Sequence, residues 1–228
     1  MPFRRAPLLA VLLLSLGPAL AIAADYKIEP LKEAPPADVA SPVKSALGET
    51  GYRISTDDGK AFLDLWLRKD IPAKSEPGKP QGAILFPFLT EGELLGVIRY
   101  QSEGYDYRDQ TIEPGIYTVR YGLQPVNGDH LGVSPFRDYG LLLPAEADQS
   151  VENLAKKPLE SRSAEASGTN HPAVLLMVQA PDGKKGPETA HDDEKDRWGA
   201  IFALPLKVEG GSSISLPVQL IIEGAAAI

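Results

Sequence analysis

Short segments in which apolar and polar residues alternate recur along most of the chain, and turn residues separate them. Such alternation puts every second side chain on one face, which is typical of half-buried β-strands. Residues 116–123 show it most clearly, with one face formed by Tyr117, Val119, Tyr121 and Leu123. Residues 138–143 are almost wholly apolar, which predicts a strand buried on both sides. The pattern therefore indicates a protein rich in β structure.

The same signals predict further strands along the chain. They span residues 51–55, 61–67, 82–88, 94–101, 173–180, 198–208 and 212–222. Residues 104–110 are expected to form an edge strand or an exposed arm. Pro205 and Pro217 lie inside the last two strands, where proline favours an edge position or a bulge. This succession predicts an all-β fold, an antiparallel β-sandwich of the immunoglobulin or jelly-roll kind, with a closed barrel as the alternative.

One segment departs from the β pattern. Residues 150–166 are rich in helix-forming residues and are expected to be the single short helical insert. Pro158 falls inside this segment and is expected to end or kink the helix. Two short helices, or a helix and a turn, are therefore expected.

The N-terminus predicts an exported protein. Arg4 and Arg5 precede an apolar stretch at residues 7–20, and Ala21-Ile22-Ala23 then supplies small residues around a cleavage point. This is the pattern of a signal peptide over residues 1–23, with an uncleaved membrane anchor as the alternative. The Pro-rich residues 24–43 are expected to be an extended leader. Residues 44–228 are then expected to be one β-sandwich domain.

Composition narrows the classes of partner. The chain has no cysteine, which excludes disulfides and a lipid anchor on cysteine. Loss of Arg4 and Arg5 with the signal peptide changes the formal net charge from −8 to −10. This acidic balance argues against binding to nucleic acid or to an anionic membrane surface. We expect the processed protein in the periplasm or outside the cell, without stable membrane insertion. A small ligand, a glycan or an envelope protein remains as a candidate partner.

Two loops contain the candidate chemistry. His130 lies in a long loop at residues 124–137, and His171 follows the helical insert. The strand at residues 138–143 and the helix have similar lengths, about 20 Å each. A helix that runs back along the strand would therefore bring the two loops to one end of the domain.

The polar residues of these loops form the candidate ligand-binding set. They are Asp129, His130, Arg137, Asp138, Asn170 and His171. His130 and His171 are the candidate ligands for a divalent metal, or a general acid and base. Alternatively, each histidine caps a turn. Arg137 is expected to tie its loop to a nearby acid and carbonyl groups, with anion binding as the alternative.

Two other patterns suggest weaker sites. Tyrosines are dense between residues 100 and 139, and Tyr105 and Tyr107 have charged neighbours that predict exposure. Exposed aromatic faces can stack on sugar rings, although tyrosine is also common in strands. The acidic residues 191–196 lack the spacing of a calcium loop, so a solvated turn is expected.

The chain contains no nucleophile elbow of the Gly-x-Ser-x-Gly type and no phosphate-binding glycine loop. These observations favour a non-catalytic binding protein over an enzyme. The alternatives are a hydrolase-like enzyme that uses His130 and His171, and a purely structural envelope protein.

Two blocks of the sequence carry a resemblance. The block PGIYTVRYGLQPVNGDHLGVSPFRDYGLLLPAEAD and the following ASGTNHPAVL resemble a family of secreted bacterial proteins of uncharacterised function. Together with the segment between them, the blocks span about a third of the processed chain. The resemblance implies an exported, single-domain β protein whose signature lies in the two histidine loops. It implies no particular activity.

Overall fold

A computed structural model describes residues 25–126 and 134–226, and this part of the chain is mostly β structure with two helices. The strands are β1 (Tyr26–Leu31), β2 (Gly51–Thr56), β3 (Ala61–Leu67), β4 (Ile71–Ala73), β5 (Leu94–Tyr100), β6 (Gly104–Tyr105), β7 (Thr111–Ile112), β8 (Gly115–Leu123), β9 (Asp138–Pro144), β10 (Ala173–Gln179), β11 (Glu188–Asp192), β12 (Arg197–Val208) and β13 (Ser213–Glu223). The helices are α1 (Ser41–Ala46) and α2 (Lys156–Ser167). The predicted all-β class with a short helical insert is confirmed.

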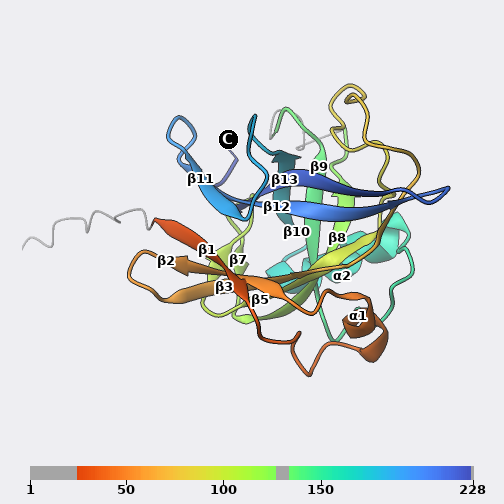
Figure 1. Cartoon of the computed structure of the whole chain (residues 1–228). Coiled ribbons are helices and arrows are strands. Elements are labelled where there is room, and N and C mark those ends of the chain that lie inside the picture. The colour runs from red at the N-terminus through yellow and green to blue at the C-terminus, as the bar shows by residue number, and fades with distance from the viewer. Residues whose placement is uncertain (1–24, 127–133, 227–228) are drawn as a thin grey trace, which may run out of the picture.

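Eleven strands form one curled sheet, in the order β1-β2-β3-β5-β8-β9-β10-β13-β12-β11, with β4 paired in parallel to β12. The other pairs in this sheet are antiparallel, and β6 and β7 form a small separate hairpin. The two end strands meet, because the Thr189 hydroxyl of β11 donates to the Tyr26 carbonyl of β1 at 2.6 Å. Figure 1 shows β12 and β13 facing the layer of β1, β2, β3 and β5.

Strand β10 is where the sheet turns from one layer to the other. Its first half, from Ala173 to Leu176, pairs with β9, and its second half, from Met177 to Gln179, pairs with β13. The large apolar core lies between the layers, where Val119, Met177 and Leu220 are buried. Curling therefore lets a single sheet bury one face against itself, which supplies most of its hydrophobic stabilisation.

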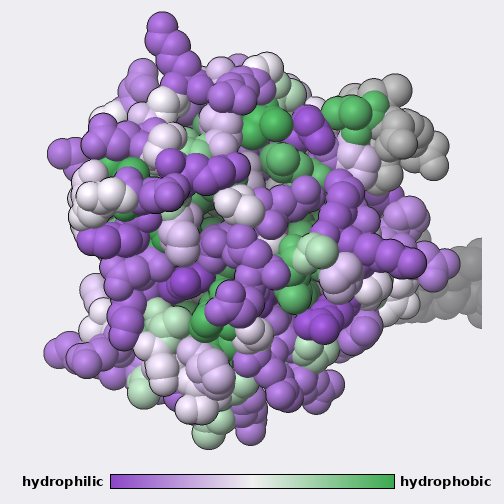
Figure 2. Space-filling view, turned by 90° about the vertical axis from the view of Figure 1, so that its right-hand side faces the viewer, coloured by the Kyte–Doolittle hydropathy of each residue, from purple (hydrophilic) through white to green (hydrophobic). Residues whose placement is uncertain are grey.

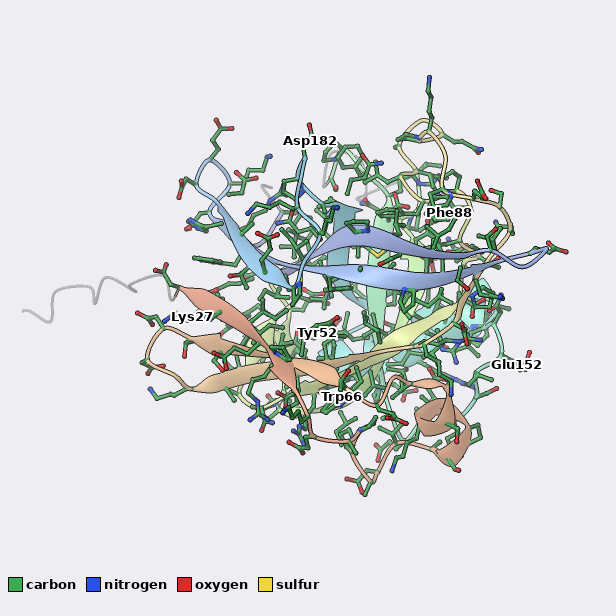
Figure 3. The ribbon with its side chains drawn as sticks, in the orientation of Figure 1. Lys27, Tyr52, Trp66, Phe88, Glu152 and Asp182 are labelled. Carbon is green, nitrogen blue, oxygen red and sulfur yellow. The ribbon has the colours of Figure 1, made fainter. Side chains whose placement is uncertain are left out.

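A second apolar cluster covers the opposite face of β3 and β5. Trp66, labelled in Figure 3, is its fully buried centre. Its indole N–H donates to the Glu33 carbonyl at 2.9 Å. Leu31, Val39 and Val43 pack over it from the N-terminal segment. This segment was expected to be an extended leader outside the domain. That expectation is wrong.

Strand β1 and helix α1 show why the N-terminal segment belongs to the fold. The whole of β1 pairs with β2, and its proline, Pro30, is tolerated because β1 ends the hydrogen-bonded order of the sheet. Pro42 occupies the first turn of α1, where a missing N–H costs nothing. The folded domain therefore includes residues 26–43, in addition to those from residue 44 onward.

Residues 82–88 were predicted to form a strand, and they form turns instead. The backbone N–H groups of Leu85 and Phe86 donate to the buried carboxylate of Asp138, at 2.7 and 3.1 Å. A side chain thus takes the hydrogen bonds that a neighbouring strand would otherwise take. Leu85, Phe86 and Phe88 are still buried, which explains the apolar pattern.

Helix α2 is continuous, and Pro158 neither ends nor kinks it. Ala155 is its N-cap, so Pro158 lies in the first turn, where backbone N–H groups have no partner within the helix. Pro205 and Pro217 were expected at an edge position or a bulge, and their positions agree with an edge. Each lies at a point where its strand pairs on one side only.

Hydrophilic side chains cover most of the face shown in Figure 2, with small separate apolar areas. Neither helix in residues 25–126 and 134–226 has the length and apolar character needed to cross a lipid bilayer.

Candidate functional site

A pocket of about 410 Å³ lies between α2 and the outer face of β8, β9 and β10, and we call it the ligand pocket. Its lining residues are Glu91, Arg108, Leu123, Gln124, Pro125, Tyr139, Leu141, Lys157, Glu160, Ser161, Ala164, Asn170, His171, Pro172 and Val174. Apolar side chains come mainly from the strands, and charged side chains come from the helix and the loops. The pocket therefore has an apolar floor and a polar rim.

One face of α2 forms a wall of the pocket. Lys157, Glu160, Ser161 and Ala164 follow the three- and four-residue spacing that puts side chains on the same helical face. On the face turned to the sheet, Leu159 is fully buried and the Ser163 hydroxyl donates to the Ala173 carbonyl at 3.1 Å. The small side chains of Ser161 and Ala164 leave space between the helix and the strands.

The floor of the pocket comes from β9 and β10. Leu141 and Val174 are direct partners in the antiparallel register, so their side chains lie on the same face. Tyr139 lies two residues before Leu141 and shares that face. Burial raises the pKa of Tyr139 well above its ordinary value, so its hydroxyl stays protonated. The floor thus offers apolar surface and one hydroxyl.

The hairpin of β6 and β7 is fixed to the pocket by Asp106. This buried carboxylate accepts hydrogen bonds from the backbone N–H groups of Arg108 at 2.8 Å, Gln110 at 2.9 Å and Val174 at 2.9 Å. Tyr107 adds a hydrogen bond from its N–H to the Val174 carbonyl at 2.7 Å. These contacts place Arg108 at the rim.

The loop that contains His171 is tied to the same hairpin by Gln110. The side-chain amide of Gln110 donates to the Pro172 carbonyl at 3.0 Å, and its carbonyl oxygen accepts from the Thr169 hydroxyl at 2.6 Å. Thr169 also accepts from the His171 backbone N–H at 2.9 Å. The backbone of His171 is therefore fixed, and its exposed side chain lines the pocket together with Asn170.

Asp106 predicts a measurable pH dependence. Burial raises its pKa above the usual 3.8, although the hydrogen bonds from Gln110, Val174 and Arg108 oppose this shift. The folded state then binds the proton more tightly than the unfolded state does, so this contribution to stability is full below about pH 4 and is lost as pH rises through the folded pKa. We expect Asp106→Asn to lower the free energy of unfolding more at pH 4 than at pH 7.

Urea unfolding of both proteins between pH 4 and pH 8 measures this difference. Asp109→Asn, at an exposed position of the same turn, controls for the loss of one charge. A difference between wild type and Asp106→Asn that does not change with pH would contradict the prediction.

The sequence-predicted site residues separate into three groups. Asp129 and His130 lie outside the described residues, so the structure does not test the meeting of His130 with His171. Asn170 and His171 line the ligand pocket. Arg137 and Asp138 do not line it, and their contacts are internal to the fold.

Arg137 ties the ends of its loop together through a carbonyl group, as expected, but within the described residues it forms no ion pair with an acid. Its side-chain Nε donates to the Gln124 carbonyl at 2.7 Å, and the Gln124 N–H donates to the Arg137 carbonyl at 2.8 Å. Asp138 is fully buried and also accepts from the Tyr121 hydroxyl at 2.6 Å. Assigning Asp138 to a ligand site was wrong, because its oxygens hold Leu85, Phe86 and Tyr121.

The glycan platform of Tyr105 and Tyr107 is not formed. Tyr105 is 46% exposed, but Tyr107 is only 6% exposed and packs against Tyr139 with ring centroids 6.0 Å apart. Tyr107 lies in the turn after β6, where strand alternation has ended, and its backbone N–H donates to the Val174 carbonyl of the sheet. A sugar-stacking surface of two tyrosines is therefore excluded here.

The acidic residues 191–196 form a turn with internal contacts. His191 stacks on Trp198 and lies 2.7 Å from the Asp193 carboxylate, while Asp192 pairs with Lys195 at 3.2 Å. Residues 25–126 and 134–226 hold no group of three or more His, Asp or Glu side chains suited to a metal ion. The candidate site is therefore the ligand pocket and not this turn.

Sequence reasoning missed Arg108 and Lys157, the two cationic residues of the pocket rim. The sequence held two signals for them. One was a basic residue in the charged turn at residues 105–110, and the other was a lysine on the same helix face as Ser161 and Ala164.

The chain was compared with protein-family models, with curated proteins and with solved structures, and nothing matches it. The resemblance to secreted bacterial proteins therefore stays a prediction.

Proposed function

We propose that this is an exported, non-catalytic binding protein that holds a small molecule with an apolar body in the ligand pocket. One observation carries the proposal: the pocket between α2 and the outer face of the sheet. Export rests on the signal-peptide pattern of residues 1–23. The curled sheet, with β10 shared between its layers, supports a β-sandwich as the scaffold.

The size and lining of the pocket support this function. Its volume of about 410 Å³ falls in the range of pockets that hold small organic ligands, roughly 300–1,000 Å³. Leu141, Val174 and Pro172 offer apolar contacts, and polar groups at the rim fix the orientation of a ligand. Burial of apolar ligand surface on the floor supplies the driving force.

The pocket favours binding over hydrolysis. Ser161 lines it, but its hydroxyl donates to the Pro158 carbonyl at 3.3 Å within the helix. No hydrogen bond joins Ser161 to His171 in the described part of the chain. An activated serine needs such a bond to its base. Binding of a divalent metal by His130 and His171 remains a proposal, because His130 lies outside the described residues.

Filling the pocket is expected to abolish ligand binding. We expect N-phenyl-1-naphthylamine, an uncharged aromatic amine that fluoresces in apolar surroundings, to bind the wild-type protein. Ala164→Phe places a ring where the helix leaves space, so we expect at least a tenfold loss of affinity, on the order of 1.4 kcal/mol. Fluorescence titration measures this affinity.

Glu165→Phe provides the matched control, because it adds the same ring at an exposed position of α2 that does not line the pocket. Circular dichroism of both variants reports whether the fold is retained. Equal binding by the wild type and a folded Ala164→Phe variant would rule out this pocket as the site.

A further inference from the structure

We propose that the ligand is an amphipathic anion, such as a carboxylate, sulfate or sulfonate on an apolar ring or chain, and that Arg108 and Lys157 bind its charge. This inference rests on the proposed function, because the apolar body occupies the same pocket.

The charged side chains at the rim of the pocket support a negatively charged ligand. Four charged residues line the pocket: Glu91, Glu160, Arg108 and Lys157. A fifth residue, Lys156, lies 3.5 Å from Glu91 and 3.5 Å from Glu160 and compensates one of their two charges, so the five side chains together carry a net charge of about +1. Within the described residues, the side chains of Arg108 and Lys157 have no hydrogen bond or ion pair. The uncompensated charge at the rim is therefore positive.

Several arginines of this chain do have a carboxylate partner. Arg53, Arg68, Arg99 and Arg120 each form an ion pair with an aspartate or a glutamate. Arg108 lines the pocket without such a pair. A cationic rim inside a protein of negative net charge points to a specific charge on the ligand.

The two cations come from elements with fixed positions. The turn of Arg108 is fastened by the Asp106 carboxylate, and Lys157 is the second residue of α2. Arginine binds a planar anion through its fork of N–H donors, and lysine adds a point charge. A ligand anion would thus replace water on groups that are already in place.

The start of α2 adds a second, independent observation. The first turn of this helix has no acidic residue and no capping side chain. A helix N-terminus carries partial positive charge, which acidic or capping residues usually occupy. Lys157 lies in that turn and lines the pocket, so the helix end and its lysine both favour an anion at this part of the rim.

The apolar floor favours an anion with an apolar part over a purely polar anion such as free phosphate. Tyr139, Leu141 and Val174 offer hydrocarbon surface that a small hydrated ion does not contact. The combination of apolar floor and cationic rim selects molecules with both parts.

Two probes with the same ring system separate this inference from the proposed function. N-Phenyl-1-naphthylamine is uncharged, and 8-anilinonaphthalene-1-sulfonate carries an added sulfonate. We expect the wild-type protein to bind the sulfonate about tenfold more tightly or better, in line with hydrogen bonds to charged groups. In the double variant Arg108→Gln and Lys157→Gln, we expect the ratio of the sulfonate affinity to the amine affinity to fall to about one, and this ratio is the readout. Fluorescence titrations at one ionic strength measure all four affinities.

The double variant Lys79→Gln and Lys185→Gln is the matched control, because it removes two positive charges from exposed positions outside the pocket. It should keep the preference for the sulfonate. If both probes bind the wild type equally, the proposal that the ligand is an anion is wrong, and the proposed binding function of the pocket stands. If neither probe binds, both proposals fail. An unchanged preference in the Arg108 and Lys157 variant would overturn the assignment to these residues.

Discussion

Replacing Asp148 with asparagine is expected to lower the free energy of unfolding by about 3–5 kcal/mol. Asp148 and Arg120 form an ion pair at 2.6 Å, and both side chains are fully buried. The substitution keeps the shape of the side chain and removes its charge. Arg120 is then a buried cation without a counter-charge, which is among the most costly changes in a folded protein.

The contacts of Arg120 explain why it cannot escape to solvent. Its five N–H donors make five hydrogen bonds: two to Asp148 and one each to the carbonyls of Gly92, Glu152 and Ser150. These bonds hold the segment before α2 against β8. Loss of Asp148 should therefore also loosen the start of α2, where Lys157 lines the ligand pocket.

Asp192→Asn is the matched control. Asp192 also pairs with an arginine, Arg197 at 3.2 Å, but its side chain is 28% exposed. A partly exposed pair contributes about 1 kcal/mol or less. Urea unfolding of the three proteins at neutral pH measures the difference. If Asp148→Asn costs no more than Asp192→Asn, then solvent reaches the Arg120 pair and the buried arrangement is wrong.

Asp138→Asn is expected to lower the free energy of unfolding by about 2–4 kcal/mol. The carboxylate of Asp138 accepts hydrogen bonds from three buried groups, the N–H groups of Leu85 and Phe86 and the hydroxyl of Tyr121. An asparagine has one acceptor oxygen, and its NH₂ group would face a backbone N–H. At least one buried donor then loses its partner.

Hydrogen exchange supplies a local readout for this prediction. The amides of Leu85 and Phe86 should exchange faster in Asp138→Asn, because the carboxylate is their acceptor. Asp58→Asn is the control: its carboxylate also accepts hydrogen bonds, from Thr56 and Lys60, but in an exposed turn. Unchanged protection at Leu85 and Phe86 would contradict the role given to Asp138.

The regular strands were predictable because their signals are local. The alternating pattern predicts strands at residues 61–67 and 116–123, and the apolar run predicts one at residues 138–143. The observed strands β3, β8 and β9 have these bounds within one or two residues. The final pair, β12 and β13, follows from two apolar stretches around Gly210-Gly211. Side-chain period and turn residues are properties of neighbouring positions, so sequence alone determines them.

The misassigned elements depend on partners that are distant in sequence. Strand β1 is short and contains Pro30, and its pairing with β2 makes it part of the sheet. Residues 82–88 have the composition of a strand, but Asp138, more than 50 positions away, takes two of their N–H groups. Neither pairing leaves a mark in the local pattern.

In the candidate site too, some features follow from the local sequence and others from contacts between distant residues. The sequence marked the loop of Asn170 and His171 as polar and turn-rich, and the structure places both residues at the ligand pocket. It also placed Asp138 in the site, although burial and three internal hydrogen bonds make that residue structural. Arg108 and Lys157 lie 49 positions apart, on a hairpin and a helix, and line one pocket only because Asp106 fixes the hairpin to β10 and α2 packs on the same strand. The residue types and the strand pattern were determined by the sequence; the meeting of these cations over an apolar floor was decided by long-range packing, which no local pattern records.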